Sequence, residues 1–217
     1  MQCKALYSNG GLRLYSTSKQ WFARQMADEF VHAARKDGFR SRAAYKLLQL
    51  NQRFNFFGSG GKSVVDLGAA PGSWSQVALQ NGARHIIGAD LLPIEPISLK
   101  AQFFECDLMD PSSSFYKSIN NHVDVVMSDM APNVSGINER DHLLSAEMAT
   151  IAIDFALKHL CKNGDLIVKI LSGQHDQHIL QSVQQYFRRV CWARPEASRK
   201  ESREIYLVAK SLLKQDK

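Results

Sequence analysis

The segment SVVDLGAAPGSWSQVAL, residues 63–79, joins a short apolar run to an amphipathic stretch through a turn with two glycines. Residues 63–67 are predicted to form a strand and residues 73–81 a helix. In an open α/β sheet, ligands bind outside the carboxyl ends of the strands, so this turn is expected to form the floor of a ligand site. Gly68 and Gly72 would let the backbone approach a bound molecule where a Cβ atom would collide.

The rest of the chain repeats this alternation of short apolar runs and helical patterns. Further strands are predicted at 85–90, 102–106, 122–128, 165–171, 189–193 and 204–209, and helices at 20–35, 41–54, roughly 112–119, 141–162 and 176–188. Strands separated by helices indicate a largely parallel sheet with helices on both faces, which is an α/β fold. Only a basic loop separates the last two strands, so they are expected to form an antiparallel hairpin at one end of the sheet.

Length and composition exclude several classes of protein. The 217 residues suit one domain, and no apolar run approaches the roughly 18 residues that a membrane-spanning helix needs. A net charge of +6 at pH 7 is compatible with a polyanionic partner. The four cysteines are far apart and form no C-x-x-C pair, so free thiols are expected. His175 and His178 have no third ligand at suitable spacing, so no metal site is expected.

The N-terminal residues form a segment of distinct composition. No acidic residue precedes Asp28, whereas basic residues, serines and glycines are frequent there. Such composition is typical of mitochondrial transit peptides, and Arg13-Leu14-Tyr15-Ser16 resembles a matrix processing site. Residues 1–18 are therefore predicted to be a targeting segment, and residues 19–212 a single domain acting in the mitochondrial matrix. The alternative is a short disordered basic tail on a cytoplasmic protein.

Acidic residues follow successive predicted strands. Asp90 comes 22 positions after Gly68, where a carboxylate can accept hydrogen bonds from both hydroxyls of a ribose, and Asp107 could accept a hydrogen bond from an adenine. The turn reads G-x-x-x-G and lacks the G-x-G-x-x-G pattern of dinucleotide-binding dehydrogenases. Gly61-Lys62-Ser63 imitates the end of a P-loop, but Phe56 occupies the position of the leading glycine.

Four further charged residues occupy positions where charge is unusual or suggestive. Asp129 follows an apolar strand, and Lys169 lies inside the apolar run LIVKIL, residues 166–171. Lysine is almost never fully buried without a partner, so Lys169 is expected to face the crevice near Asp129. Lys46 lies within a predicted helix and Glu204 opens the last strand. Each of these two could instead be an ordinary surface charge.

Six segments closely resemble the FtsJ/RrmJ family of RNA ribose 2′-O-methyltransferases, in family order from about residue 18 to 210. They are RSRAAYKL (40–47), GAAPGSWSQ (68–76), DLLP (90–93), SDMAPN (128–133), VK (168–169) and PEASRKESREIY (195–206). The resemblance implies a Rossmann-like, S-adenosylmethionine-dependent methyltransferase fold with a seven-stranded, mostly parallel sheet and an antiparallel last strand. It also implies that the domain is a methyltransferase.

The resemblance also implies the site residues. The family's catalytic tetrad of Lys, Asp, Lys and Glu falls on Lys46, Asp129, Lys169 and Glu204. S-adenosyl-L-methionine is the implied cofactor, and the residues expected to bind it are Gly68, Ala70, Pro71, Gly72, Ser73, Trp74, Asp90, Asp107 and Asp129. Ser73 departs from the glycine or alanine of many members, but a small residue should still admit the cofactor.

Residues 195–204 look most like the branch that acts on large-subunit ribosomal RNA, and with the N-terminal segment they resemble its mitochondrial member. The implied substrate is a uridine 2′-hydroxyl of mitochondrial large-subunit rRNA, met as rRNA or in the assembling large subunit. A monomer is expected. The alternatives are a tRNA methyltransferase of the same family and a non-catalytic RNA-binding factor of ribosome assembly.

Two predictions concern how RNA is held and activated. Lys169 could act as a base, if the neighbouring cation Lys46 lowers its pKa, or could stay protonated and stabilise the developing alkoxide. The sequence leaves both open. RNA phosphates are expected to meet two basic clusters, which comprise Arg35, Lys36, Arg40, Arg42 and Lys46, and Arg188, Arg189, Arg194, Arg199, Lys200 and Arg203.

Overall fold

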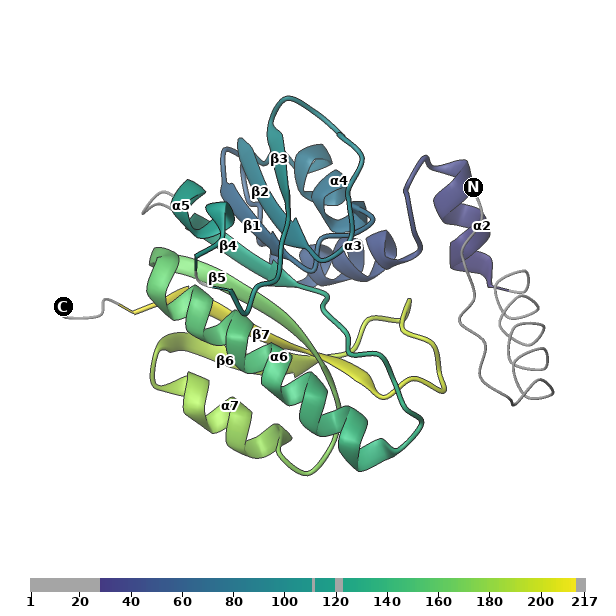
Figure 1. The fold of residues 1–217 in the computed structure, drawn as a ribbon, viewed down its shortest axis with the longest axis vertical. Helices are drawn as coiled ribbons and strands as arrows, with labels where there is room; N and C mark the ends of the chain where they lie inside the picture. Colours follow the sequence, from purple (N-terminus) through teal and green to yellow (C-terminus); the bar gives the residue numbers. More distant parts are fainter. Residues whose placement is uncertain (1–27, 111, 120–122, 214–217) are drawn as a thin grey trace.

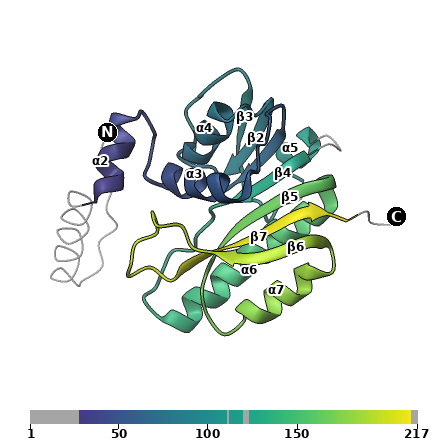
Figure 2. The same cartoon turned by 180° about the vertical axis from the view of Figure 1, so that it is seen from behind.

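A computed structural model describes residues 28–110, 112–119 and 123–213. The predicted targeting segment, residues 1–18, lies outside the described residues, as does the first part of the predicted helix 20–35. Figure 1 shows one central twisted sheet with helices packed against it, and Figure 2 shows the same arrangement from behind.

The sheet has seven strands in the order β3-β2-β1-β4-β5-β7-β6. Neighbours from β3 to β5 pair in parallel, and β7 pairs antiparallel to both β5 and β6. The predicted antiparallel hairpin at one end of the sheet is thereby confirmed, with β7 as the inner strand. The bounds are β1 Ser63–Leu67, β2 His85–Asp90, β3 Ala101–Glu105, β4 Val123–Ser128, β5 Leu160–Leu171, β6 Phe187–Ala193 and β7 Glu204–Leu212.

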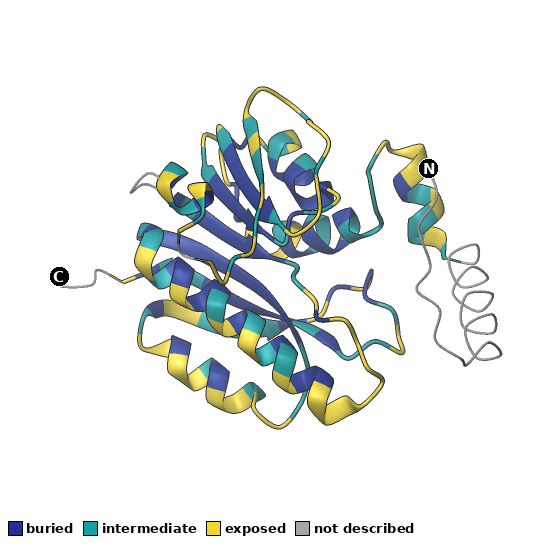
Figure 3. Cartoon of the chain, viewed as in Figure 1, coloured by how far each residue is buried: buried dark blue, intermediate teal, exposed yellow. Residues whose placement is uncertain are grey.

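Helices cover both faces of the sheet because alternate strand residues point to opposite faces and both sets are apolar. On one face, α3 and α4 pack over a core that includes Val64, Ile167 and Val208. On the other face, α5, α6 and α7 pack over a core that includes Val65 and Leu207. Figure 3 shows the buried strands between helices whose outer surfaces are exposed. The helix bounds are α2 Glu29–Lys36, α3 Ala43–Phe54, α4 Ser73–Gln80, α5 Ser114–Ser118, α6 Asn138–His159 and α7 Asp176–Gln184.

Several predicted boundaries are wrong, most clearly at two junctions between a helix and the strand that follows it. The helix predicted to reach residue 162 ends at His159, and β5 begins at Leu160 rather than at residue 165. Asn163 has φ of 66°, and the pairing of β5 with β4 shifts between Val123 and Val125, so this strand has an irregular start. The helix predicted at 176–188 ends at Gln184, and β6 begins at Phe187, because Phe187 packs into the core as a strand residue.

The basic region before β1 forms two helices, α2 and α3, and one carboxylate helps to tie α2 to the rest of the domain. Asp28 caps α2 by accepting a hydrogen bond of 3.2 Å from the Phe30 N–H. Its Oδ2 atom also lies 2.5 Å from Arg42 Nη1 and 3.1 Å from Arg199 Nε. Asp28 therefore links α2, the start of α3 and the loop between β6 and β7. In the described residues, no helix has the length and apolar character required to cross a membrane.

Candidate active site

The carboxyl ends of the parallel strands bring the predicted site residues to one edge of the sheet. Gly68 follows β1, Asp90 ends β2 and Asp129 follows β4. Because β7 runs antiparallel, its first residue, Glu204, reaches the same edge and pairs with Leu171. Two residues further along the same strands, Lys169 pairs directly with Tyr206. The side chains of Lys169, Glu204 and Tyr206 therefore lie on one face of the sheet.

Lys169 and Asp129 form the centre of the site. Lys169 Nζ lies 3.0 Å from Asp129 Oδ1 and also donates a hydrogen bond to the backbone carbonyl of Asp129. Lys169 is only 8% exposed, so the ammonium has taken a defined partner in place of water. This contact confirms the expected proximity of the two residues, which are 40 positions apart in the chain.

Lys46 and Glu204 form a second buried ion pair. Lys46 Nζ donates to Glu204 Oε2 at 2.8 Å, and the two residues are 9% and 8% exposed. Neither is a surface charge, so that alternative is wrong for both. Helix α3 carries Lys46 onto the sheet face that bears Lys169 and Tyr206, with Leu47 and Leu50 of the same helix buried in the core. All four residues of the predicted tetrad are therefore brought to the same edge of the sheet.

The charges of the site act on one another. Burial raises the pKa of the Asp129 carboxyl. The charges of Lys169 and Lys46 and the hydrogen bonds from Lys169 and Tyr206 together lower it by more, so the pKa lies below its ordinary value. Asp129 is consequently a carboxylate at neutral pH. The effect of Lys46 on Asp129 also means that the two ion pairs form one electrostatic unit.

Tyr206 is a further site residue, for which the sequence had indicated no role. Its hydroxyl donates a hydrogen bond of 2.9 Å to Asp129 Oδ1, and the residue is fully buried. Burial, followed by the carboxylates of Asp129 and Glu204, raises the pKa of Tyr206 well above its ordinary value, so it stays a donor. Its ring lies 5.8 Å from that of Trp74. The strand period of two could have identified Tyr206, because it shares the face of Glu204.

A cavity of about 350 Å³ opens beside the tetrad, at the carboxyl ends of β1 to β4. Five of the predicted cofactor residues line it, namely Gly68, Ala70, Asp90, Asp107 and Asp129. Apolar side chains, including Leu92, Met130 and Ile151, supply much of the remaining wall. Carboxylates among apolar walls fit an adenosine with its ribose, and the volume lies in the range of small-molecule sites. These residues are thus suited to hold S-adenosylmethionine.

Backbone hydrogen bonds fix the floor of this cavity. Asp90 Oδ2 accepts from the Ala70 N–H at 2.9 Å, and Oδ1 accepts from the Leu92 N–H at 2.9 Å. Each oxygen keeps a second lone pair for a hydroxyl of a ribose. Gly68 has φ of 75°, and a Cβ there would lie 2.5 Å from Met130 Cγ, so only glycine suits the position.

Four other predicted cofactor residues, Pro71 to Trp74, are not among those that line the cavity. The Ser73 hydroxyl lies 2.6 Å from that of Ser41, and Trp74 Nε1 donates to the carbonyl of Ala43 at 2.9 Å. Their side chains therefore fasten α4 to α3. Contact with a cofactor would use the backbone N–H groups at the start of α4, which helix geometry leaves without a partner inside the helix. Their cofactor role stays a prediction.

Asp66 is fully buried in the apolar strand β1, two residues before Gly68 of the cavity lining. Its Oδ2 accepts a hydrogen bond of 2.7 Å from the Ser75 hydroxyl, while its Oδ1 has no hydrogen-bond partner in the described part of the chain. Burial is the main cause that raises the pKa of Asp66 to about 7, and the carboxylates of Asp129 and Asp90 add to it. No motif of the sequence had indicated a role for Asp66.

Many of the basic residues predicted to meet RNA are engaged in holding loops. Arg40 donates to the carbonyls of Pro71, Glu95 and Pro96 at 2.9, 2.6 and 3.0 Å. Six of the eleven predicted residues have a backbone carbonyl or a carboxylate as a side-chain partner, namely Lys46, Arg40, Arg42, Arg194, Arg199 and Arg203. In the described structure the side chains of Arg35, Lys36, Arg188 and Lys200 form neither a hydrogen bond nor an ion pair, and Arg189 lies 6.0 Å above the Phe54 ring.

The two histidines that could have suggested a metal are exposed. His175 stacks on His142 with ring centroids 5.4 Å apart, and its backbone N–H donates to His142 Nε2. Within residues 28–110, 112–119 and 123–213, no group of three or more potential ligands is placed to hold a metal ion.

Comparison with known proteins shows the family of the chain. Residues 39–212 match the FtsJ-like methyltransferase family. Proteins named ribosomal RNA large subunit methyltransferase E from Acidiphilium cryptum and Rickettsia felis are 46% and 43% identical over 195 and 202 residues, which are 89% of this chain and 86% and 88% of theirs. A solved structure described as a ribosomal RNA methyltransferase from Plasmodium falciparum is 32% identical with a TM-score of 0.72, and the match covers 82% of this chain and 100% of that one. The chain therefore belongs to the FtsJ-like methyltransferase family.

Proposed function

We propose that this enzyme transfers a methyl group from S-adenosylmethionine to a ribose 2′-hydroxyl, on a uridine of large-subunit ribosomal RNA during ribosome assembly. One observation carries the proposal: Asp129 lines the cofactor cavity and also contacts Lys169. A methyl donor in the cavity and an oxygen held by Lys169 would then be adjacent. The names of the relatives support large-subunit rRNA over tRNA as the substrate.

The residues of the tetrad can position the acceptor oxygen and remove its proton. S-adenosylmethionine, when bound, supplies an electrophilic methyl group. Two oxygens of Asp129 accept from the Lys169 ammonium, and its third N–H can donate to a ribose hydroxyl. Holding that oxygen in line at near-attack distance can contribute several kcal/mol. The hydroxyl loses its proton to Lys169 Nζ while this nitrogen passes one of its own protons to the Asp129 carboxylate, which Tyr206 and Lys46 keep ionised before the transfer.

RNA is distinguished from DNA by the nucleophile itself, because only RNA carries the 2′-hydroxyl. The ammonium of Lys46, on α3, is held in place by Glu204 and lies close enough to lower the pKa of Asp129. The pair is thus placed to hold the target nucleotide against the edge of the sheet. We expect a monomer to suffice, because one chain supplies the cavity and the tetrad; light scattering measures this.

The substitution Lys169→Ala tests the assignment directly. Methyl transfer from tritiated S-adenosylmethionine to unmodified large-subunit rRNA should fall to background, while calorimetric affinity for S-adenosylmethionine stays within about twofold of wild type, since Lys169 does not line the cavity. Lys158→Ala, which removes an exposed lysine of α6, serves as the matched control. Substantial activity in Lys169→Ala would remove this residue from catalysis.

Substrate and location require separate experiments. Incubation with unmodified large-subunit rRNA, with assembled large subunits and with tRNA, followed by mapping of the alkali-resistant position, should find one uridine in the large-subunit RNA. Transfer to tRNA alone would contradict the rRNA assignment. For a mitochondrial location, the support is the acid-poor, basic composition before Asp28. Residues 1–20 fused to a fluorescent reporter should direct it to mitochondria, and a diffuse cytosolic signal would refute the targeting role.

A further inference from the structure

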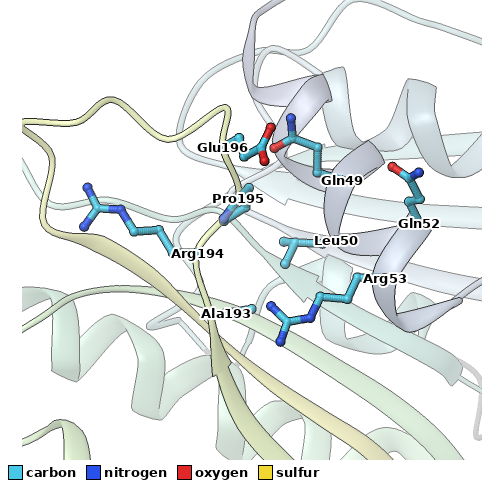
Figure 4. Close-up of a pocket in the computed structure, with 8 residues that line it drawn as sticks. All are labelled: Gln49, Leu50, Gln52, Arg53, Ala193, Arg194, Pro195 and Glu196. Atoms are coloured by element: carbon cyan, nitrogen blue, oxygen red, sulfur yellow. The ribbon is translucent and has the colours of Figure 1, made fainter.

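A second cavity, of about 300 Å³, lies between α3 and the segment that follows β6. Figure 4 shows its lining: Leu50, Ala193 and Pro195 supply apolar surface, while amide, guanidinium and carboxylate groups surround them. The polar residues are Gln49, Gln52, Arg53, Arg194 and Glu196. The cavity is separate from the cofactor cavity, and no residue lines both.

The wall formed by the segment after β6 is held in place by hydrogen bonds. The Ala197 N–H donates to Gln49 Oε1 at 2.8 Å, which ties the segment to α3. Arg194 Nη2 donates to the carbonyls of Arg199, Lys200 and Ser202, so it crosslinks the loop that leads to β7. These contacts do not depend on a ligand. The cavity is therefore formed in advance, which lowers the entropic cost of binding.

The remaining polar groups of the cavity are uncommitted. Within the described chain, the side chains of Gln52, Arg53 and Glu196 form no hydrogen bond or ion pair, although Arg53 lies 4.9 Å above the Phe54 ring. The carboxylate of Glu196 and the guanidinium of Arg53 line one cavity without pairing. A matching ligand would bring both an anionic group and hydrogen-bond donors. A nucleotide has this combination, in its phosphate and in the edge of its base.

The cavity also lies close to the tetrad along the same elements. Gln49, Leu50 and Arg53 follow Lys46 by three, four and seven residues, so all lie on one face of α3, about 5 to 10 Å along its axis. The loop from Arg194 to Arg203 starts at the cavity and ends at Glu204, the partner of Lys46. An RNA strand with its target ribose at Lys46 would therefore place a neighbouring nucleotide near this cavity.

We propose that this cavity binds an unpaired nucleotide of the RNA substrate, one or two positions from the methylated ribose. The inference rests on the proposed RNA methyltransferase function. The base packs on Leu50 and Pro195, its donor groups meet Glu196, and Arg53 meets a phosphate. A base in a duplex has its edge occupied by its partner, so the cavity selects substrates in which this position is unpaired.

The test uses the full-length enzyme with Arg53→Gln, Glu196→Gln and a control, Arg84→Gln, which removes an exposed arginine just before β2. Arg53→Gln should raise KM for large-subunit rRNA about tenfold with kcat and S-adenosylmethionine affinity unchanged, as expected for one lost charge-assisted hydrogen bond. Its binding should also show a salt dependence weaker by about one phosphate contact. Arg84→Gln should change KM by less than about twofold, the behaviour of an uninvolved surface charge.

RNA variants identify the occupant and separate the outcomes. Wild-type enzyme receives RNA fragments with a single abasic nucleotide at each position flanking the methylated one. One abasic position should raise the wild-type KM about tenfold yet have little further effect on Glu196→Gln, because the two changes remove the same contact. Equal effects on both enzymes, or unchanged KM in Arg53→Gln and Glu196→Gln, would overturn the proposal. So would a defect seen with ribosomal subunits but not with protein-free RNA, since the occupant would then be a protein. A wild-type enzyme that methylates no RNA would instead refute the proposed function itself.

Discussion

The Tyr206 hydroxyl donates a 2.9 Å hydrogen bond to Asp129 Oδ1, the same oxygen that Lys169 Nζ approaches at 3.0 Å. A single oxygen of Asp129 thus contacts both the buried Tyr206 of β7 and the proposed catalytic Lys169 of β5. Because Tyr206 is fully buried and its register with Lys169 is fixed by the sheet, the orientation of Asp129 is set by the fold rather than by solvent. This relationship ties the geometry of the reaction centre to the core.

Tyr206→Phe should leave the fold intact and lower kcat about tenfold, the cost of a hydrogen bond to a charged group. That hydrogen bond lowers the pKa of Asp129, so its loss should raise this pKa and move the acidic limb of the rate profile to higher pH. The measurement is kcat and kcat/KM against pH, with Tyr186→Phe, whose hydroxyl has no contact with the site, as the control. An unchanged profile would mean that Tyr206 only fills space.

The Lys46–Glu204 pair should matter for stability as well as activity. Glu204→Ala leaves the buried ammonium of Lys46 without its partner, which should lower the free energy of unfolding by roughly 3 kcal/mol. The double substitution Lys46→Met with Glu204→Leu should recover most of that loss, because two apolar residues replace a buried pair. It should nevertheless remain inactive. Urea unfolding and methyl transfer measure the two effects, and an active double variant would exclude Lys46 and Glu204 from the reaction.

Asp66 should make stability depend on pH. Its pKa is raised from 3.8 in the unfolded chain to about 7, so between these values the folded state binds the extra proton. The contribution of this group to the free energy of unfolding therefore falls as pH rises from about 4 to about 7, and levels off above. Asp66→Asn, which can still accept the Ser75 hydrogen bond, should remove this slope and be more stable than wild type at pH 8. Urea unfolding from pH 4 to 8 measures it, with the exposed Asp154→Asn as control; identical slopes in wild type and Asp66→Asn would contradict the assignment.

Arg40 should support the cofactor cavity rather than bind RNA. Its guanidinium holds the carbonyls of Pro71, Glu95 and Pro96, and so joins the glycine turn to the segment after β2, whose Leu91 and Leu92 line the cavity. Arg40→Ala should weaken S-adenosylmethionine binding by about tenfold in calorimetry, since hydrogen bonds from a charged donor are lost. KM for RNA should change less. The reverse pattern would return Arg40 to the RNA-binding surface.

Local sequence pattern predicted the architecture, and together with the family motifs it singled out residues that the fold gathers at one edge of the sheet. The alternation of apolar runs and helical stretches predicts a parallel sheet, and carboxylates at successive strand ends predict a ligand site, because parallel strands end at one edge. Lys169 inside an apolar strand was conspicuous because burying an unpaired charge is costly. Boundaries were less well predicted, as at Leu160, where helix and strand adjoin without a polar loop.

Apart from the contact of Lys169 with Asp129, partnership between distant side chains could not be inferred in this way. Nothing near Lys46 in the chain indicates Glu204, and nothing near Asp129 indicates Tyr206; strand register and the placement of α3 create both contacts. The arginines show the same limit, since composition makes all of them available to RNA, whereas folding commits Arg40 and Arg194 to backbone carbonyls. The physical reason is that residue type and spacing fix local conformation and burial, while the partner of a buried polar group depends on which segments pack together.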